Sequence, residues 1–260
     1  MNMEMGQIYK ISFIPSADQG AIILMADITE SQMAAKMRQE FSANVSHELN
    51  TPLTFISGFA EIIAKGQLEV TDMVHFAHKI EDEAKRMIVM VEDILFLSKL
   101  DAMEKDEDFE KIDVSQEAAE AIESLRLTAE ASQVELSLAD FPSSIYGNRQ
   151  LIYGMFTKLI SNAIRYNKPQ GWVKVAVSHK NGFAYINVSD SGVGIPKEEQ
   201  YRVFERFYRV EDSRNQKTGG AGLGLSIVKH IVRYHGGTID LESKLGEGTS
   251  IFIKLPQGNV

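Results

Sequence analysis

Apolar residues recur every three or four positions in the first part of the chain, which is the spacing of one face of an α-helix. The pattern runs from Ile28 to about Ala64, then from Met73 to about Leu100, with a break at Gly66-Gln67. Each predicted helix carries one apolar stripe. Because a hairpin of two such helices leaves part of each stripe uncovered, we expect two copies of the chain to pair as a four-helix bundle.

Two short strands are predicted before the first helix, at residues 9–14 and 21–26, on either side of a polar turn. Two strands alone do not make a stable sheet. We therefore interpret residues 1–27 as the end of a domain that begins further upstream, together with the start of the helix.

The second half of the chain alternates between helical and strand periodicities. Its predicted elements are helices at 114–132, 149–166 and 223–234 and strands at 134–138, 172–178, 184–188, 238–242 and 250–255. This order predicts a mixed α+β layer domain over residues 111–260. The helical hairpin takes residues 28–101, and the acidic stretch 102–110 is interpreted as a solvated linker.

Composition narrows the classes of function. The 260 residues have a formal net charge of −9, which argues against nucleic acid or an anionic membrane as the main partner. The absence of cysteine excludes disulfides and thiolate chemistry. Neither an apolar run of about 18 residues nor a secretory signal is present, so we expect a soluble intracellular chain that forms part of a larger protein.

His47 is the first candidate for chemistry. On a helical wheel it falls nearly opposite the apolar stripe, with Thr51 one turn further on the same side and Glu48 beside it. A neutral imidazole in this setting can attack phosphorus, with the carboxylate as acid or base. The alternative is an ordinary surface or core histidine. A His-Glu-x-x-His zinc site is excluded because Thr51 stands where the second histidine is needed.

Two glycine clusters form the second candidate site. One, Asp190-Ser-Gly-Val-Gly-Ile-Pro, follows a predicted strand; the other, Gly219-Gly-Ala-Gly-Leu-Gly-Leu, opens a helix. Backbone N–H groups at such positions can close on a phosphate, and a buried Asp190 can accept from the exocyclic amine of a purine. Neither cluster has the spacing of a P-loop or a Rossmann fold.

The helix at 149–166 places Lys158, Asn162 and Tyr166 four residues apart on one polar face, with Arg165 nearby. One interpretation is a solvated helix surface. The other is that Asn162 binds Mg²⁺, which takes few protein oxygens beside water and phosphate.

These segments together resemble the conserved boxes of bacterial sensor histidine kinases. The stretch from Phe41 to Leu53 resembles the H box. The resemblance extends in the family's order through the N box at 159–166, the first glycine box at 190–196, the F box at 203–209, the second glycine box at 219–229 and the last at 246–249. Residues 26–30 are similar to the end of a PAS-type sensor domain. The nearest likeness is to the phosphate- and cell-wall-sensing group.

The resemblance implies a fold and an activity. The fold would be a dimeric helical hairpin, forming a four-helix bundle, followed by a Bergerat-type α/β sandwich that binds ATP and Mg²⁺. His47 would take the γ-phosphoryl group and pass it to an aspartate of a response regulator, with Glu48 as acid/base partner. Thr51 would position water when the same chain dephosphorylates the regulator. The parent protein would be anchored in the membrane through upstream segments, with this portion in the cytoplasm.

The resemblance also implies a nucleotide site. Asn162 would bind Mg²⁺, and a lid would lie between about Tyr208 and Gly219. The remaining nucleotide contacts would be Arg165, Tyr166, Asp190, Gly192, Gly194, Arg209, Gly220, Gly222, Leu223, Gly224 and Thr249.

Two positions depart from the family's pattern. Lys158 stands where the N box usually opens with asparagine, and Asn50 replaces the basic residue usual before Thr51. Lys158 either reaches a phosphate directly or disturbs the metal and its waters. A kinase-impaired scaffold or phosphatase is therefore the alternative function. An isolated ATPase of the gyrase or chaperone type would lack the helix that carries His47.

Overall fold

The computed structural model describes residues 7–15, 21–66, 68–103, 108–210 and 220–258. The chain forms two compact units, Met1–Glu83 and Ala84–Val260. The boundary between them falls inside the second long helix, so the C-terminal half of that helix belongs to the same unit as the α+β domain.

The first unit contains α1 (Thr29–Ala64) and the N-terminal part of α2 (Val70–Ala102), which together form a helical hairpin. The bounds of both helices are close to the predicted limits. Asp27 fixes the start of α1, since its Oδ1 accepts both the backbone N–H of Thr29, at 2.9 Å, and the Thr29 hydroxyl, at 2.6 Å. The rings of Phe59 and Phe76 stack between the two helices with centroids 5.5 Å apart. The periodicity argument for a hairpin is therefore confirmed.

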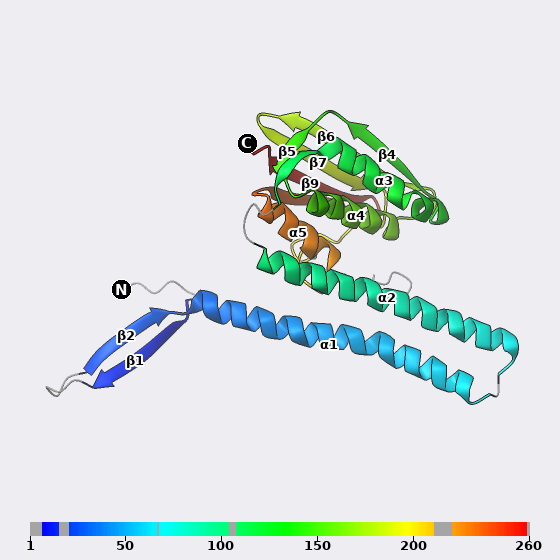
Figure 1. Cartoon of the computed structure of the whole chain (residues 1–260), viewed down its shortest axis with the longest axis horizontal. Helices are drawn as coiled ribbons and strands as arrows, with labels where there is room; N and C mark the ends of the chain where they lie inside the picture. The colour runs from blue at the N-terminus through cyan, green and yellow to red at the C-terminus, as the bar shows by residue number, and fades with distance from the viewer. Residues whose placement is uncertain (1–6, 16–20, 67, 104–107, 211–219, 259–260) are drawn as a thin grey trace. The chain divides into compact units, whose positions relative to one another are not determined.

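The two predicted N-terminal strands are present as an antiparallel ribbon, β1 (Tyr9–Pro15) and β2 (Ala21–Asp27) (Figure 1). Phe13 pairs with Ile23 on one face, and Ser12 pairs with Leu24 on the other. Phe13, Ile23 and Leu24 are all exposed. The ribbon thus presents apolar side chains on both of its faces.

The second unit contains a five-stranded sheet in the order β4-β6-β7-β9-β8, in which β4 and β6 are parallel and the other pairs antiparallel. A two-stranded sheet of β3 and β5 lies beside it. Helices α3, α4 and α5 lie against one face of the large sheet, with α4 between the other two (Figure 1). The bounds are β3 Glu110–Asp113, α3 Val114–Ala131, β4 Val134–Asp140, β5 Ser144–Gly147, α4 Arg149–Arg165, β6 Gly171–Lys180, β7 Phe183–Asp190, α5 Gly224–Tyr234, β8 Thr238–Lys244 and β9 Gly248–Pro256.

Two details differ from the prediction. Strand β5 was not expected, because its four residues are too short to show a period. Helix α2 continues to Ala102, two residues beyond its predicted end at about Leu100, and the Asp101 carboxylate in its last turn accepts from Arg206. The hairpin between β6 and β7 turns at Asn181 and Gly182, both of which have positive φ.

The N-terminus of α4 is fixed by Asn148, which is buried. Its side-chain oxygen accepts the N–H of Leu151 at 3.1 Å, and its own N–H donates to Nε2 of His235 at 3.0 Å. The opposite ring nitrogen of His235 lies 2.8 Å from the carbonyl of Ile231. Because Nε2 accepts, Nδ1 carries the proton and donates to that carbonyl. The start of α4 is thereby bonded to the end of α5.

Replacing Asn148 with alanine should lower the free energy of unfolding by about 1–2 kcal/mol, the usual cost of losing a helix N-cap. Asn148→Ser should retain most of the stability, because serine also caps well. Urea unfolding of the two variants measures the difference. Equal losses in both would show that the cap oxygen does not stabilise α4.

Candidate functional site

His47 is exposed near the middle of α1, as the helical wheel predicts. Thr51 lies one turn further along, and its hydroxyl donates to the carbonyl oxygen of His47 at 3.2 Å. Glu48 is half-buried and Pro52 is buried on the other side of the helix. The imidazole is therefore open to an incoming group, with a hydroxyl close by.

Asp190 ends β7 and is half-buried at the edge of the sheet. Its Oδ1 accepts the N–H groups of Gly192, at 2.8 Å, and Thr249, at 3.3 Å. Within the described residues its Oδ2 accepts no hydrogen bond. Burial raises the pKa of Asp190, and the two N–H groups offset part of that rise. The free oxygen can accept a proton donor from a ligand.

Tyr166 packs tightly against the first glycine cluster. Its carbonyl oxygen accepts the N–H of Val193 at 3.1 Å. A Cβ atom on Gly192 would lie 2.3 Å from the same oxygen, so a larger residue cannot fit there. Gly194 lies as closely against the backbone of Lys244. The fold thus brings together Asp190, Gly192, Gly194, Tyr166 and Thr249, which the sequence places in three separate boxes.

Asn162 and Arg165 occupy the last part of α4. The side-chain amide of Asn162 makes no hydrogen bond to the described residues, so its oxygen remains available. The guanidinium of Arg165 lies against Gly220, where a Cβ atom would be 2.3 Å from Nη1. The N box and the second glycine cluster therefore meet at this point.

The second glycine cluster joins the F box to α5. Gly222 has a φ of +70°, and its carbonyl accepts the N–H of Phe207 at 3.0 Å. Leu223 is buried, and Gly224 is the first residue of α5 with open space around its Cα. Arg209 is half-buried and lies one residue before the described segment ends at residue 210. Most of the predicted lid, residues 211–219, lies outside the described residues.

Two polar contacts of this site were not predicted. The Ser191 hydroxyl, which is buried, accepts the N–H of Trp172 and donates to Asn167 Oδ1 at 3.1 Å. The Ser243 hydroxyl lies 2.9 Å from that of Thr249. The Ser191 contacts join residues 19 and 24 positions apart, whereas Ser243 and Thr249 are six apart; serine alone gives no motif by which either could be found.

Lys158 has a protein partner that the sequence did not predict. Its ammonium forms an ion pair with Asp93 of α2. The two side chains are only 28% and 13% exposed, so water screens the pair less than an ordinary surface pair. The lysine at this position therefore connects α4 to α2.

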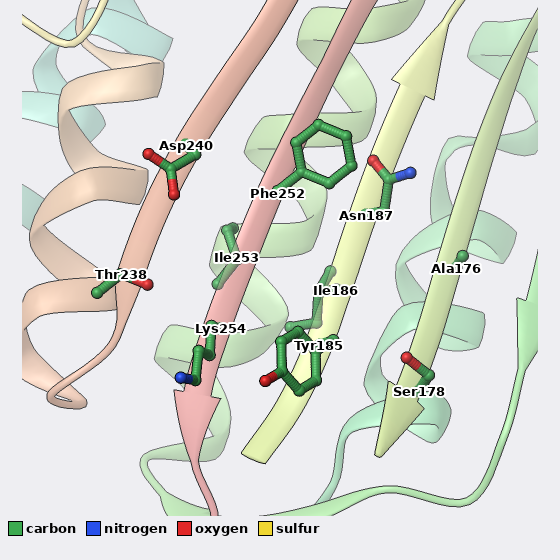
Figure 2. A pocket seen from close by; sticks show the side chains of 10 residues that line it. All are labelled: Ala176, Ser178, Tyr185, Ile186, Asn187, Thr238, Asp240, Phe252, Ile253 and Lys254. Atoms are coloured by element: carbon green, nitrogen blue, oxygen red, sulfur yellow. The ribbon is translucent and has the colours of Figure 1, made fainter. Parts of the chain in front are cut away.

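A shallow groove of about 240 Å³ lies elsewhere, on the face of the sheet opposite the helices (Figure 2). The groove is lined by side chains that include Tyr185, Phe252, Lys254 and Asp240. Ile253 lies between Phe252 and Lys254 on β9, and its side chain points toward the helices (Figure 2). The groove contains none of the predicted site residues. It is thus separate from the glycine clusters.

Comparison with known families matches both parts of the chain. Residues 37–102 match the His Kinase A (phospho-acceptor) domain, and residues 147–259 match the histidine kinase-, DNA gyrase B- and HSP90-like ATPase. Together the two matches cover most of the chain, in the order that the boxes require. The chain belongs to the histidine kinase family.

Relatives of the chain include the sensor histidine kinase WalK of Bacillus subtilis, which is 38% identical over 242 residues. That match covers 91% of this chain and 39% of WalK. The sensor-like histidine kinase SenX3 of Mycolicibacterium smegmatis is 35% identical over 239 residues, covering 91% of this chain and 62% of SenX3. The chain thus spans less than two thirds of each relative.

Among solved structures, histidine kinase ThkA in complex with response regulator protein TrrA has the same fold, with a TM-score of 0.69 and 23% identity. The match covers 99% of this chain and 77% of ThkA. Within the described residues, every helix is too short or too polar to cross a membrane.

Proposed function

We propose that this chain is the catalytic core of a homodimeric sensor histidine kinase. It would transfer the γ-phosphoryl group of ATP to His47 and then to an aspartate of a response regulator. The observation that carries the proposal is that His47 is exposed on α1, within the segment that matches a phospho-acceptor domain. The ATPase-like domain, with Asp190 and the two glycine clusters, follows it in the sequence. In this proposal the domains are 28–101 and 111–260, joined by 102–110.

The site around Asp190 suits an adenine nucleotide. The free Oδ2, when ionised, would accept from the exocyclic amine of the base. The N–H groups near Gly220 and Gly222, at the start of α5, would approach the phosphates. Arg165 lies against Gly220 and would add positive charge on the same side.

Asn162 fits a magnesium site because its amide oxygen is not engaged by the described residues and Mg²⁺ prefers oxygen ligands. When bound, Mg²⁺ would neutralise charge on the phosphates. The protein's own contribution would be to hold the nucleotide and to present His47.

In the proposed reaction, the ring nitrogen of His47 that bears a lone pair attacks the γ-phosphorus. The N–P bond forms as the bond from phosphorus to the bridging β-phosphate oxygen breaks, and ADP leaves with that electron pair. The imidazole then loses its other ring proton to Glu48. Most of the acceleration would come from positioning and charge neutralisation.

A second copy of the chain is the proposed structural partner. Exposed apolar residues lie along both long helices, and on α2 Ile88, Val91 and Leu95 follow helical spacing. A second hairpin would cover them in a four-helix bundle.

Residues 1–27 are proposed to be the end of a PAS-like sensor domain. The apolar residues on both faces of the β1–β2 ribbon support this proposal, because such residues would be covered by the rest of that domain. The parent protein would be anchored in the membrane, with the kinase core in the cytoplasm.

A kinase-impaired scaffold or phosphatase is the second candidate, and Lys158 is its only support. The ion pair with Asp93 gives this lysine a structural partner, which does not favour impairment. Incubation with γ-labelled ATP separates the two: the kinase takes up label, whereas the scaffold binds nucleotide and stays unlabelled.

Replacing Thr51 with alanine should slow dephosphorylation of the regulator about tenfold or more, because a positioned water is lost, and should change autophosphorylation by less than about twofold. Thr54→Ala is the matched control, since Thr54 also bonds a carbonyl on α1, that of Asn50 at 2.8 Å. Both rates are measured with purified receiver domain. A parallel fall of both rates would refute a separate role for Thr51.

A further inference from the structure

The C-terminal half of α2 contacts the α+β domain at several points along one face. Asp93 binds Lys158, and the ring of Phe96 lies beside Gly154, near enough that an added Cβ atom would be 3.8 Å from it. Five residues after Phe96, Asp101 accepts from Arg206 at 3.0 and 3.2 Å. These contacts recur at three- to five-residue intervals, as expected for one side of a helix.

The two charged contacts differ in their surroundings. Asp101 and Arg206 are 47% and 37% exposed, so water and salt screen their attraction. His230 of α5 also faces Asp101, at 3.5 Å, and bonds the backbone of Leu100. Asp93 is 13% exposed, and its ion pair with Lys158 is the better shielded of the two. The Asp93–Lys158 pair is therefore the stronger candidate for holding α2 on the domain.

Lys158 lies one helical turn before Asn162 on the same face of α4. In the proposed function, Asn162 would hold the metal and the phosphates, and the acceptor histidine would have to approach that end of the nucleotide. A helix bound at Lys158, one turn from Asn162, would then restrict that approach on one side. Nucleotide can still enter, because Asp190 and the glycine clusters make no described contact with α2.

We propose that the Asp93–Lys158 ion pair holds α4 on α2 in a resting arrangement, and that it must open before His47 is phosphorylated. Lys158 is then a positioning residue that restrains the kinase and does not bind phosphate. The proposal rests on the kinase function proposed above.

The test compares Asp93→Asn, Lys158→Asn, the double variant and the charge exchange Asp93→Lys with Lys158→Asp, all in the whole chain. At saturating ATP, each single variant should raise the initial rate of His47 labelling about two- to tenfold, the effect of losing a partly shielded ion pair. The double variant should be no faster than either single one, and the exchange should return the rate toward wild type. Affinity for a non-hydrolysable ATP analogue should stay unchanged.

Glu92→Gln is the matched control, because it removes the same charge from the exposed neighbouring position. A rate that stays the same or falls in Asp93→Asn would overturn the proposal. So would weaker binding of the analogue in Lys158→Asn alone, which would make Lys158 a phosphate ligand.

A second measurement does not depend on catalysis. The chain has no cysteine, so spin labels can be attached at Ser98→Cys on α2 and Lys168→Cys beyond α4, both exposed positions. Pulsed EPR should give a narrower distance distribution for the wild-type pair than for Asp93→Asn or Lys158→Asn. Identical distributions would overturn the ion pair's role even in an active kinase. An unlabelled wild-type chain with the expected distributions would instead count against the kinase function alone.

Discussion

Replacing His47 with glutamine should abolish the transfer of phosphate from ATP to the protein. Glutamine keeps a polar side chain at an exposed helix position, so α1 and its hairpin should fold as before. It has no ring nitrogen with a free lone pair at neutral pH, so no N–P bond can form. Nucleotide affinity should stay within about twofold of wild type, because the nucleotide contacts proposed for the α+β domain do not include His47.

The control is His78→Gln, which changes another exposed histidine, on α2. It should retain full labelling. Phosphate that persists in His47→Gln at the wild-type level would remove His47 as the acceptor and point to another nucleophile.

Replacing Asp190 with asparagine should weaken the binding of adenine nucleotides by about tenfold or more, since a buried hydrogen bond to a charged group contributes about 1.5–3 kcal/mol. Asparagine can keep both protein N–H groups on its Oδ1, but its NH₂ then stands in place of Oδ2 and faces the amine of the base as donor against donor. Calorimetry with ADP measures the loss. Asp240→Asn, on the exposed side of β8, is the control and should bind normally.

The same carboxylate should make nucleotide binding sensitive to acid. Burial raises the pKa of Asp190, so this group takes up a proton at a higher pH than an ordinary aspartate. Protonated Asp190 accepts less well, and affinity should therefore fall as the pH drops through that raised pKa and recover above it. Asp190→Asn should lose this dependence. Equal affinity of wild type and variant across the pH range would show that Asp190 does not contact the base.

Local patterns predicted most of the helices and strands. The long helices follow from apolar residues at three- and four-residue spacing, and the turn at Asn181-Gly182 follows from two residues that tolerate positive φ. Strand β5 was missed because four residues carry too little pattern, and because its pairing with β3 joins segments about 30 residues apart. The last two residues of α2, Asp101 and Ala102, lie beyond its predicted end at about Leu100, because acidic residues suit both a linker and an exposed helix end.

In the candidate site, too, the features with a local sequence pattern were predicted, whereas contacts between distant residues were not. The wheel placed His47 on an exposed face beside Thr51, and the glycine clusters indicated close backbone approach, as at Gly192. The partner of Lys158 could not be predicted, since Asp93 is 65 residues away in the sequence. An ion pair between distant helices leaves no periodic signal, whereas a helix face or a tight turn does.

The most direct test of the proposed kinase is the chemical nature of the bond that it forms. The purified chain is incubated with γ-labelled ATP and Mg²⁺, and the labelled protein is then divided between acid and base. A phosphoramidate on His47 predicts label that is lost in acid and kept in base. Label that survives acid, or no label although ATP binds, would contradict the account.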